Sequence, residues 1–163
     1  MQHLWAPWRI SYIRDKKEKG CVFCLKQKSN DDRHSLILSR GAHSFVLMNL
    51  YPYNNSHLLI SPYKHVENTE KLNKETLNEI IWFANESMII IKETLNADGY
   101  NFGANIGSAG GAGIADHIHF HVVPRWNGDT NFMPIIGETK VQVQGLQETY
   151  DELIIHFDKL TNN

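Results

Sequence analysis

His117-Ile118-His119-Phe120-His121-Val122-Val123-Pro124 is a β-branched and aromatic run with a histidine at every second position. The composition predicts a strand, and a strand sends alternate side chains to opposite faces. The three histidines then share one face, which we interpret as exposed, while Ile118, Phe120 and Val122 turn toward the core. Imidazoles are costly to bury without hydrogen-bond partners, so this pattern favours catalysis or metal binding over a polar strand face with incidental histidines.

The length and charge of the chain limit the classes of protein it can belong to. Its 163 residues and formal net charge of −2 predict one soluble domain over residues 1–163 and give no support to a non-specific nucleic-acid binder. Within the domain we expect an N-terminal arm over residues 1–30, a core over 31–134, and a C-terminal extension with a helix over 135–163. The first residues lack the long apolar stretch of a secretory signal, and no segment is long enough to span a bilayer. We therefore expect a cytoplasmic protein with no membrane partner.

Cys21 and Cys24 are the two cysteines of the chain, in a C-x-x-C spacing within the arm. A structural disulfide is not expected in a reducing compartment. The spacing leaves a redox pair, two spare thiols or half of a zinc site. Redox motifs normally sit on a strand-to-helix turn, which this charged, loop-like segment does not resemble.

Hydrophobic periodicity predicts an α+β fold with one antiparallel sheet. Apolar runs bounded by turn residues indicate three neighbouring strands at residues 36–39, 45–50 and 58–61, and a fourth at 100–106. An apolar stripe with spacings of three and four residues predicts a long helix over 73–95. A last helix is expected over 146–160.

Several segments resemble the histidine triad family of nucleotidyl hydrolases and transferases. HIHFHVV fits the family's HxHxHxx signature with apolar x, and residues 54–62 resemble its G-H-hydrophobic-P strand with Ser56 in place of glycine. Residues 4–9, 51–54 and 124–134 are similar to bacterial members related to the fragile histidine triad enzymes, which include diadenosine tetraphosphate phosphorylases. The resemblance implies an antiparallel sheet of about five strands with a long helix and a C-terminal helix, and a homodimer.

Catalytic roles follow from the resemblance together with imidazole chemistry. A neutral imidazole can attack phosphorus in line and hold a nucleotidyl group as a phosphoramidate, and the resemblance implies that His119 is this nucleophile. A backbone carbonyl on its second nitrogen would fix the tautomer. His121 and His57 match the family's supporting positions, where they would donate hydrogen bonds to phosphate oxygens.

The resemblance also implies a nucleotide-binding set. Asn49 matches a ribose contact, Asn105 a contact to ribose or phosphate, and Trp126 is expected to stack on a base or close the pocket. The glycine-rich stretch 107–113 offers backbone amides to phosphate. Many members carry Gln-Ser or Gln-Thr before the first triad histidine, where this chain has Gly113 and Ile114, so that Ser108 or backbone amides must replace the hydroxyl. The full predicted set is Asn49, Asn105, Gly107, Ser108, Gly113, Ile114, His119, His121 and Trp126.

Zinc-containing members of the family complete a C-x-x-C pair with two histidines. The matching positions here are His65, in the segment Pro62-Tyr63-Lys64-His65, and His117. Four protein ligands make a closed structural zinc site that would not activate water. We expect zinc at Cys21, Cys24, His65 and His117, and no organic cofactor.

The predicted function is cleavage of a dinucleoside polyphosphate, with diadenosine tetraphosphate as the best candidate, by phosphorolysis or hydrolysis. One alternative is a nucleoside phosphoramidase or another nucleotide hydrolase of the same family, which the missing serine or threonine disfavours. A second alternative is a zinc-stabilised, non-catalytic nucleotide-binding module.

Overall fold

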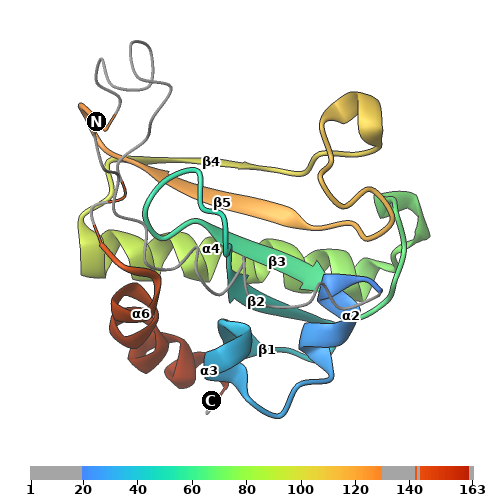
Figure 1. The fold of residues 1–163 in the computed structure, drawn as a ribbon, viewed down its shortest axis with the longest axis horizontal. Coiled ribbons are helices and arrows are strands. Elements are labelled where there is room, and N and C mark those ends of the chain that lie inside the picture. The colour runs from blue at the N-terminus through green and yellow to red at the C-terminus, as the bar shows by residue number, and fades with distance from the viewer. Residues whose placement is uncertain (1–19, 130–141, 143, 162–163) are drawn as a thin grey trace, which may run out of the picture.

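Five antiparallel strands form one sheet in the order β1-β2-β3-β5-β4 (Figure 1). The structure is a computed structural model that describes residues 20–129, 142 and 144–161. Most of the predicted N-terminal arm, the segment 4–9 and residues 130–134 of the segment 124–134 lie outside the described residues. The strands are β1 (Ile37–Arg40), β2 (Ser44–Met48), β3 (Leu58–Pro62), β4 (Gly99–Gly103) and β5 (Phe120–Arg125). The α+β class and the five-stranded antiparallel sheet are confirmed.

Two strand boundaries differ from the sequence prediction. β5 begins at Phe120, where its pairing with β3 starts opposite Ile60, because the backbone N–H of Ile118 donates instead to the carbonyl of Val66. His117 and His119 therefore precede the strand. β4 ends at Gly103 opposite His121, and residues 104–106 already belong to the loop that follows.

Six helical segments accompany the sheet among the residues that the structure describes. The long helix α4 begins after Asn73, whose side chain accepts from the backbone N–H of Thr76, and ends at Leu95, before the left-handed residue Asn96 with φ 50°. These boundaries match the predicted helix, and the C-terminal helix is also confirmed. The helices are α2 (Val22–Gln27), α3 (Asp32–Ser35), η1 (Thr69–Lys71), α4 (Lys74–Leu95), η2 (Ser108–Gly110) and α6 (Leu146–Thr161).

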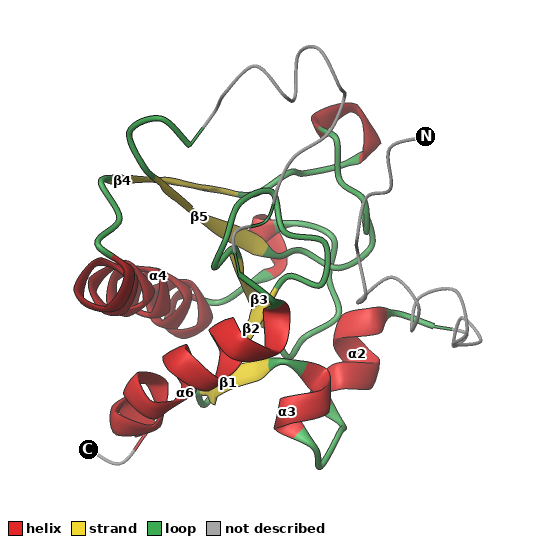
Figure 2. Cartoon of the chain, turned by 60° about the vertical axis from the view of Figure 1, so that its left-hand side comes forward, coloured by secondary structure: helices red, strands yellow, loops and turns green. Residues whose placement is uncertain are grey.

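Alternate residues of the strands enter two apolar clusters on opposite faces of the sheet. Ile118, Phe120 and Val122 pack in the larger cluster with α4 and α6, as the alternating pattern predicted. The smaller cluster, on the other face, contains Phe23 of α2 and Leu59 of β3, among others. Figure 2 shows α4 and α6 on one side of the strands and α2 on the other. The histidines lie on the face covered by α2.

Within the part of the chain that the structure describes, no helix has the length and apolar character needed to cross a membrane.

Candidate active site and metal centre

His119 is buried immediately before β5, and its two ring nitrogens have different surroundings. Its Nδ1 lies 2.9 Å from the backbone carbonyl oxygen of His117. A carbonyl only accepts, so Nδ1 carries the proton and Nε2 retains a lone pair. The carbonyl acceptor expected from the sequence is therefore present. Burial lowers the pKa of His119, which favours the neutral form that a nucleophile needs.

Phe23 packs against His119 from α2. The two ring centroids are 4.7 Å apart, and the phenyl ring also lies 5.1 Å from the imidazole of His117. Phe23 is 1% exposed, so it forms a fixed wall beside the nucleophile position. Sequence reasoning did not assign it a role, although its place between the two cysteines ties it to the same short helix.

A hydrogen-bonded series of side chains holds His121 next to His119. Backbone N–H of Tyr53 and the amide of Asn49 both reach Nδ1 of His57, at 3.0 and 3.2 Å, so Nδ1 accepts and Nε2 of His57 carries the proton. That Nε2 lies 2.9 Å from Nδ1 of His121 and donates to it. Nε2 of His121 is then a donor, and it has no hydrogen-bond partner among the described residues. The arrangement presents one N–H beside the lone pair of His119.

His57 and Asn49 therefore lie behind His121 in this structure. His57 is 1% exposed with both ring nitrogens engaged, and Asn49 also accepts from the backbone N–H of Tyr51. These contacts suit positioning groups that orient His121. The predicted direct roles, His57 in catalysis and Asn49 on ribose, stay predictions.

Burial governs the charge of His121. Burial, together with a smaller effect of the neighbouring His119, lowers the pKa of this imidazole to about 4. We expect NMR titration to show a midpoint of about 4 for His121, well below the ordinary 6.5, with the assignment made by loss of the resonance in His121→Gln. A midpoint at or above 6.5 would contradict the buried, neutral donor described above.

An open groove begins at His121 and follows the β4–β5 half of the sheet. Its volume is about 410 Å³. Gly103 pairs with His121 and Asn101 with Val123, so these residues share the histidine face of the sheet. We call this cavity the β4–β5 groove; its lining residues are Tyr53, Asn54, Asn101, Phe102, Gly103, Ala104, Asn105, His121, Val123 and Arg125. Of the predicted nucleotide contacts, Asn105 and His121 belong to it.

The glycine-rich loop joins β4 to β5 on the outside of the molecule. Gly107 and Gly111 adopt φ of 71° and 82°, which side chains other than glycine rarely tolerate. Gly107, Ser108 and Gly113 are exposed, whereas Ile114 packs against the smaller apolar cluster that contains Phe23. Ile114 thus anchors the loop on the histidine side, and phosphate binding by the loop stays a prediction.

The structure does not bring Trp126 to the histidines. Its indole N–H donates to the carbonyl of Leu95 at 3.0 Å, and the ring packs against the larger cluster beside the end of α4. Seven residues of extended chain separate it from His119, roughly 20 Å. The contacts of Trp126 fasten the end of β5 to α4 in this chain, and its predicted role in stacking on a base or closing the pocket stays a prediction.

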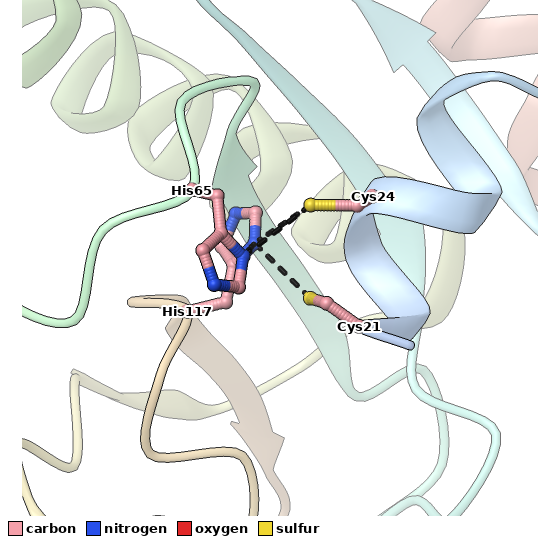
Figure 3. A group of neighbouring side chains, drawn as sticks. All are labelled: Cys21, Cys24, His65 and His117. Atoms are coloured by element: carbon pink, nitrogen blue, oxygen red, sulfur yellow. Dashed lines mark hydrogen bonds between the residues drawn. The ribbon is translucent and has the colours of Figure 1, made fainter. Parts of the chain in front are cut away.

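The four predicted metal ligands converge at the start of α2 (Figure 3). Cys21 caps the helix and Cys24 lies on its first turn, so the C-x-x-C pair opens a helix and is not the loop we expected. Nδ1 of His117 lies 3.2 Å from Sγ of Cys21 and 3.6 Å from Sγ of Cys24. Nδ1 of His65 lies 3.1 Å from that of His117 and 3.4 Å from Sγ of Cys24.

These distances fit the edges of a zinc tetrahedron. Zn–S bonds of about 2.3 Å and Zn–N bonds of about 2.0 Å place ligand nitrogens about 3.3 Å from each other and about 3.5 Å from the sulfurs. The second ring nitrogens are also oriented: Nε2 of His117 lies 3.0 Å from the carbonyl oxygen of Pro62, and Nε2 of His65 lies 3.6 Å from Asp116. Such outer contacts fix the ring position of a metal-binding histidine. The donor set is that of a closed structural zinc site.

Comparison with known proteins agrees with this geometry. The family model described as HIT domain matches residues 30–128. The chain is 36% identical over 157 residues to a protein of Mycobacterium tuberculosis named AP-4-A phosphorylase, covering 91% of this chain and 80% of that one. The chain belongs to the HIT domain family. The matched residues include all three triad histidines, His57 and His65, and exclude both cysteines.

Solved structures of HIT proteins share the fold. A Zn-bound histidine triad family protein from Mycobacterium smegmatis superposes with a TM-score of 0.69 at 23% identity, over 88% of this chain and 96% of that chain. A histidine triad nucleotide-binding protein from Sulfolobus tokodaii gives 0.67 at 26% identity, over 86% and 94%. The HIT fold expected from the resemblance is thus confirmed, and the family membership supports a nucleotide-processing enzyme.

Proposed function

We propose that this HIT protein is a nucleotidyl transferase or hydrolase that cleaves dinucleoside polyphosphates, with diadenosine tetraphosphate as its best candidate substrate. The observation that carries the proposal is the pairing of an unprotonated Nε2 on His119 with a donor Nε2 on His121. The printed name of the relative from M. tuberculosis supports the choice of substrate.

The first chemical step transfers a nucleotidyl group to His119. The Nε2 lone pair attacks the α-phosphorus, a P–N bond forms, and the bond between that phosphorus and the bridging oxygen breaks with its electrons on the departing nucleoside polyphosphate. Nδ1–H of His119 remains bonded to the carbonyl of His117, which stabilises the positive charge that the ring gains. Nε2–H of His121 donates to an oxygen of the reacting phosphate.

The second step returns His119 to its starting form. An oxygen of inorganic phosphate or of water attacks the α-phosphorus, the P–N bond breaks, and the electron pair returns to Nε2. With diadenosine tetraphosphate, phosphate as the acceptor gives ADP and ATP, whereas water gives AMP and ATP. The name of the relative favours phosphate.

Product analysis with labelled phosphate tests the proposal. We expect diadenosine tetraphosphate and ³²P-phosphate to yield ATP and ADP, with the label in ADP alone. Unlabelled AMP and ATP would assign hydrolysis, and two unlabelled ADP molecules would contradict attack at the α-phosphorus. Release of AMP from adenosine 5′-phosphoramidate but not from the tetraphosphate would favour the phosphoramidase alternative. Binding without any product would favour the non-catalytic module.

Zinc is the metal that we propose for the Cys21–Cys24–His65–His117 site, because the donor set and spacings fit it and a Zn-bound HIT structure is known. When bound, the metal supplies a structural cross-link between α2 and the segments that carry the two histidines. With four protein ligands, such a metal would have no open coordination position for substrate. A homodimer and a cytoplasmic location remain predictions from the sequence.

A further inference from the structure

We propose that the β4–β5 groove holds the leaving nucleotide, meaning the nucleoside polyphosphate beyond the α-phosphorus. This inference rests on the proposed function and extends it, since it assigns each half of the substrate to a side of His119. The ligand class is a nucleoside di- or triphosphate, which departs when the P–N bond forms.

The orientation of His119 gives the direction in which the leaving group lies. Its Nδ1–H points back to the carbonyl of His117, on the side where the chain enters β5. The two nitrogens of an imidazole point to opposite sides of the ring, so the Nε2 lone pair points away from that carbonyl. In-line displacement places the leaving oxygen beyond phosphorus on this same axis. His121, whose ring centroid is 5.0 Å from that of His119, lies next along the strand, and the groove begins there.

The other side of His119 is closed by apolar side chains. Phe23 contacts its ring, and Phe23 belongs to the cluster of Leu47 and Leu59, against which Ile114 packs. An anionic polyphosphate chain loses hydration against such a surface without gaining hydrogen bonds. The polar groove therefore suits the polyphosphate better than the side that carries α2.

The lining of the groove suits an anionic nucleotide. His121 lines its entrance with its Nε2 itself buried, and among the described residues that line the groove none is acidic. The carboxamide of Asn101 accepts from Arg125 through Oδ1, which leaves its amide nitrogen as the donor end, whereas the amide nitrogen of Asn105 donates to the carbonyl of Gly111 at 3.5 Å. Tyr53, 54% exposed, stacks nearly parallel to His121 with an interplanar angle of 14° and forms one wall. A volume of about 410 Å³ lies in the range of small-molecule sites.

Gly103 allows the groove to be filled without disturbing the fold. It lies opposite His121 on β4, and a Cβ built there meets no atom within 4 Å. A valine side chain would enter the groove, and β-branched residues suit strands. Gly99→Val is the matched control: it is the same change on the same strand and face, it also has free space, and it lies outside the groove lining.

The experiment compares two substrates that share the adenylyl group but differ in leaving group. We expect Gly103→Val to lower kcat/KM for diadenosine tetraphosphate about tenfold or more relative to kcat/KM for adenosine 5′-phosphorimidazolide. The leaving group of this second substrate is imidazole alone, which does not need the groove. Gly99→Val should leave the ratio of the two values unchanged. An unchanged ratio in Gly103→Val, or an equal change in Gly99→Val, overturns the groove assignment while the proposed function stands. Turnover of neither substrate by the wild-type protein removes the proposed function, and the groove assignment with it.

Discussion

Replacing His119 by alanine should lower kcat for diadenosine tetraphosphate by on the order of 10⁴-fold or more, because the P–N bond can no longer form. Nucleotide binding should persist, since the substitution opens space beside Phe23 without removing His121 or the groove. The measurement is a steady-state rate together with calorimetric binding of AMP. His43→Ala is the control, because His43 is an exposed imidazole in the β1–β2 loop and should leave both quantities unchanged.

Trapping the covalent intermediate is a second test of His119 as the nucleophile. Rapid acid-free denaturation during turnover, followed by mass spectrometry, should find an adenylyl group on the peptide that contains His119 in the wild type. The His119→Ala protein should carry none. If His119→Ala keeps a rate within tenfold of the wild type, or if the adduct maps to His57 or His121, the assignment of the nucleophile is wrong.

Much of the fold was predictable because the apolar pattern repeats consistently. Alternation in residues 118–122 separates the core face from the histidine face, and the apolar stripe in 73–95 predicts the extent of α4. The start of β5 was not predictable, since it depends on a hydrogen bond from Ile118 to Val66, which is distant in sequence. The short helix α2 was missed because six residues carry too little periodicity to distinguish a helix from a loop.

The sequence predicted which residues form the candidate site better than it predicted how they are arranged. The alternation correctly placed the histidines on one face, but that face is not exposed: His117 and His119 are buried, and each has a ring N–H bonded to a backbone carbonyl. Those carbonyl partners offset the free-energy cost of burying an imidazole, and this cost was the reason for expecting an exposed face. The four metal ligands come from three separate segments and were grouped only by family resemblance. Tyr53, Asn101 and Phe23 were given no individual role from the sequence, because their roles depend on neighbours that the fold brings together.

Loss of the metal should have the largest effect on stability. We expect one zinc per chain in protein purified without chelators, and we expect Cys24→Ser to lose it. Ligand removal takes away folding free energy that the bound metal contributes, so the Tm should fall by about 10 °C or more. Elemental analysis and thermal unfolding give both readouts. Leu25→Ala is the control, because Leu25 lies on the same helix, is 36% exposed and is not a metal ligand, so that the variant should keep the metal and the Tm within a few degrees.

The metal-free protein should also show a change at His119, because two contacts join the metal centre to the nucleophile. The carbonyl that accepts from Nδ1 of His119 belongs to the ligand His117, and Phe23, which packs on the imidazole, lies between the ligands Cys21 and Cys24. Freed from the metal, α2 and residue 117 gain freedom, and the single tautomer should give way to a mixture. The ¹⁵N chemical shifts of the imidazole measure the tautomer directly. In the zinc-loaded protein we expect two well-separated signals for His119, one from the protonated Nδ1 and one from the unprotonated Nε2. In Cys24→Ser, measured below its Tm, we expect the two shifts to move toward their average. Unaltered His119 signals in a metal-free, folded variant would show that the centre stabilises the chain without holding the nucleophile.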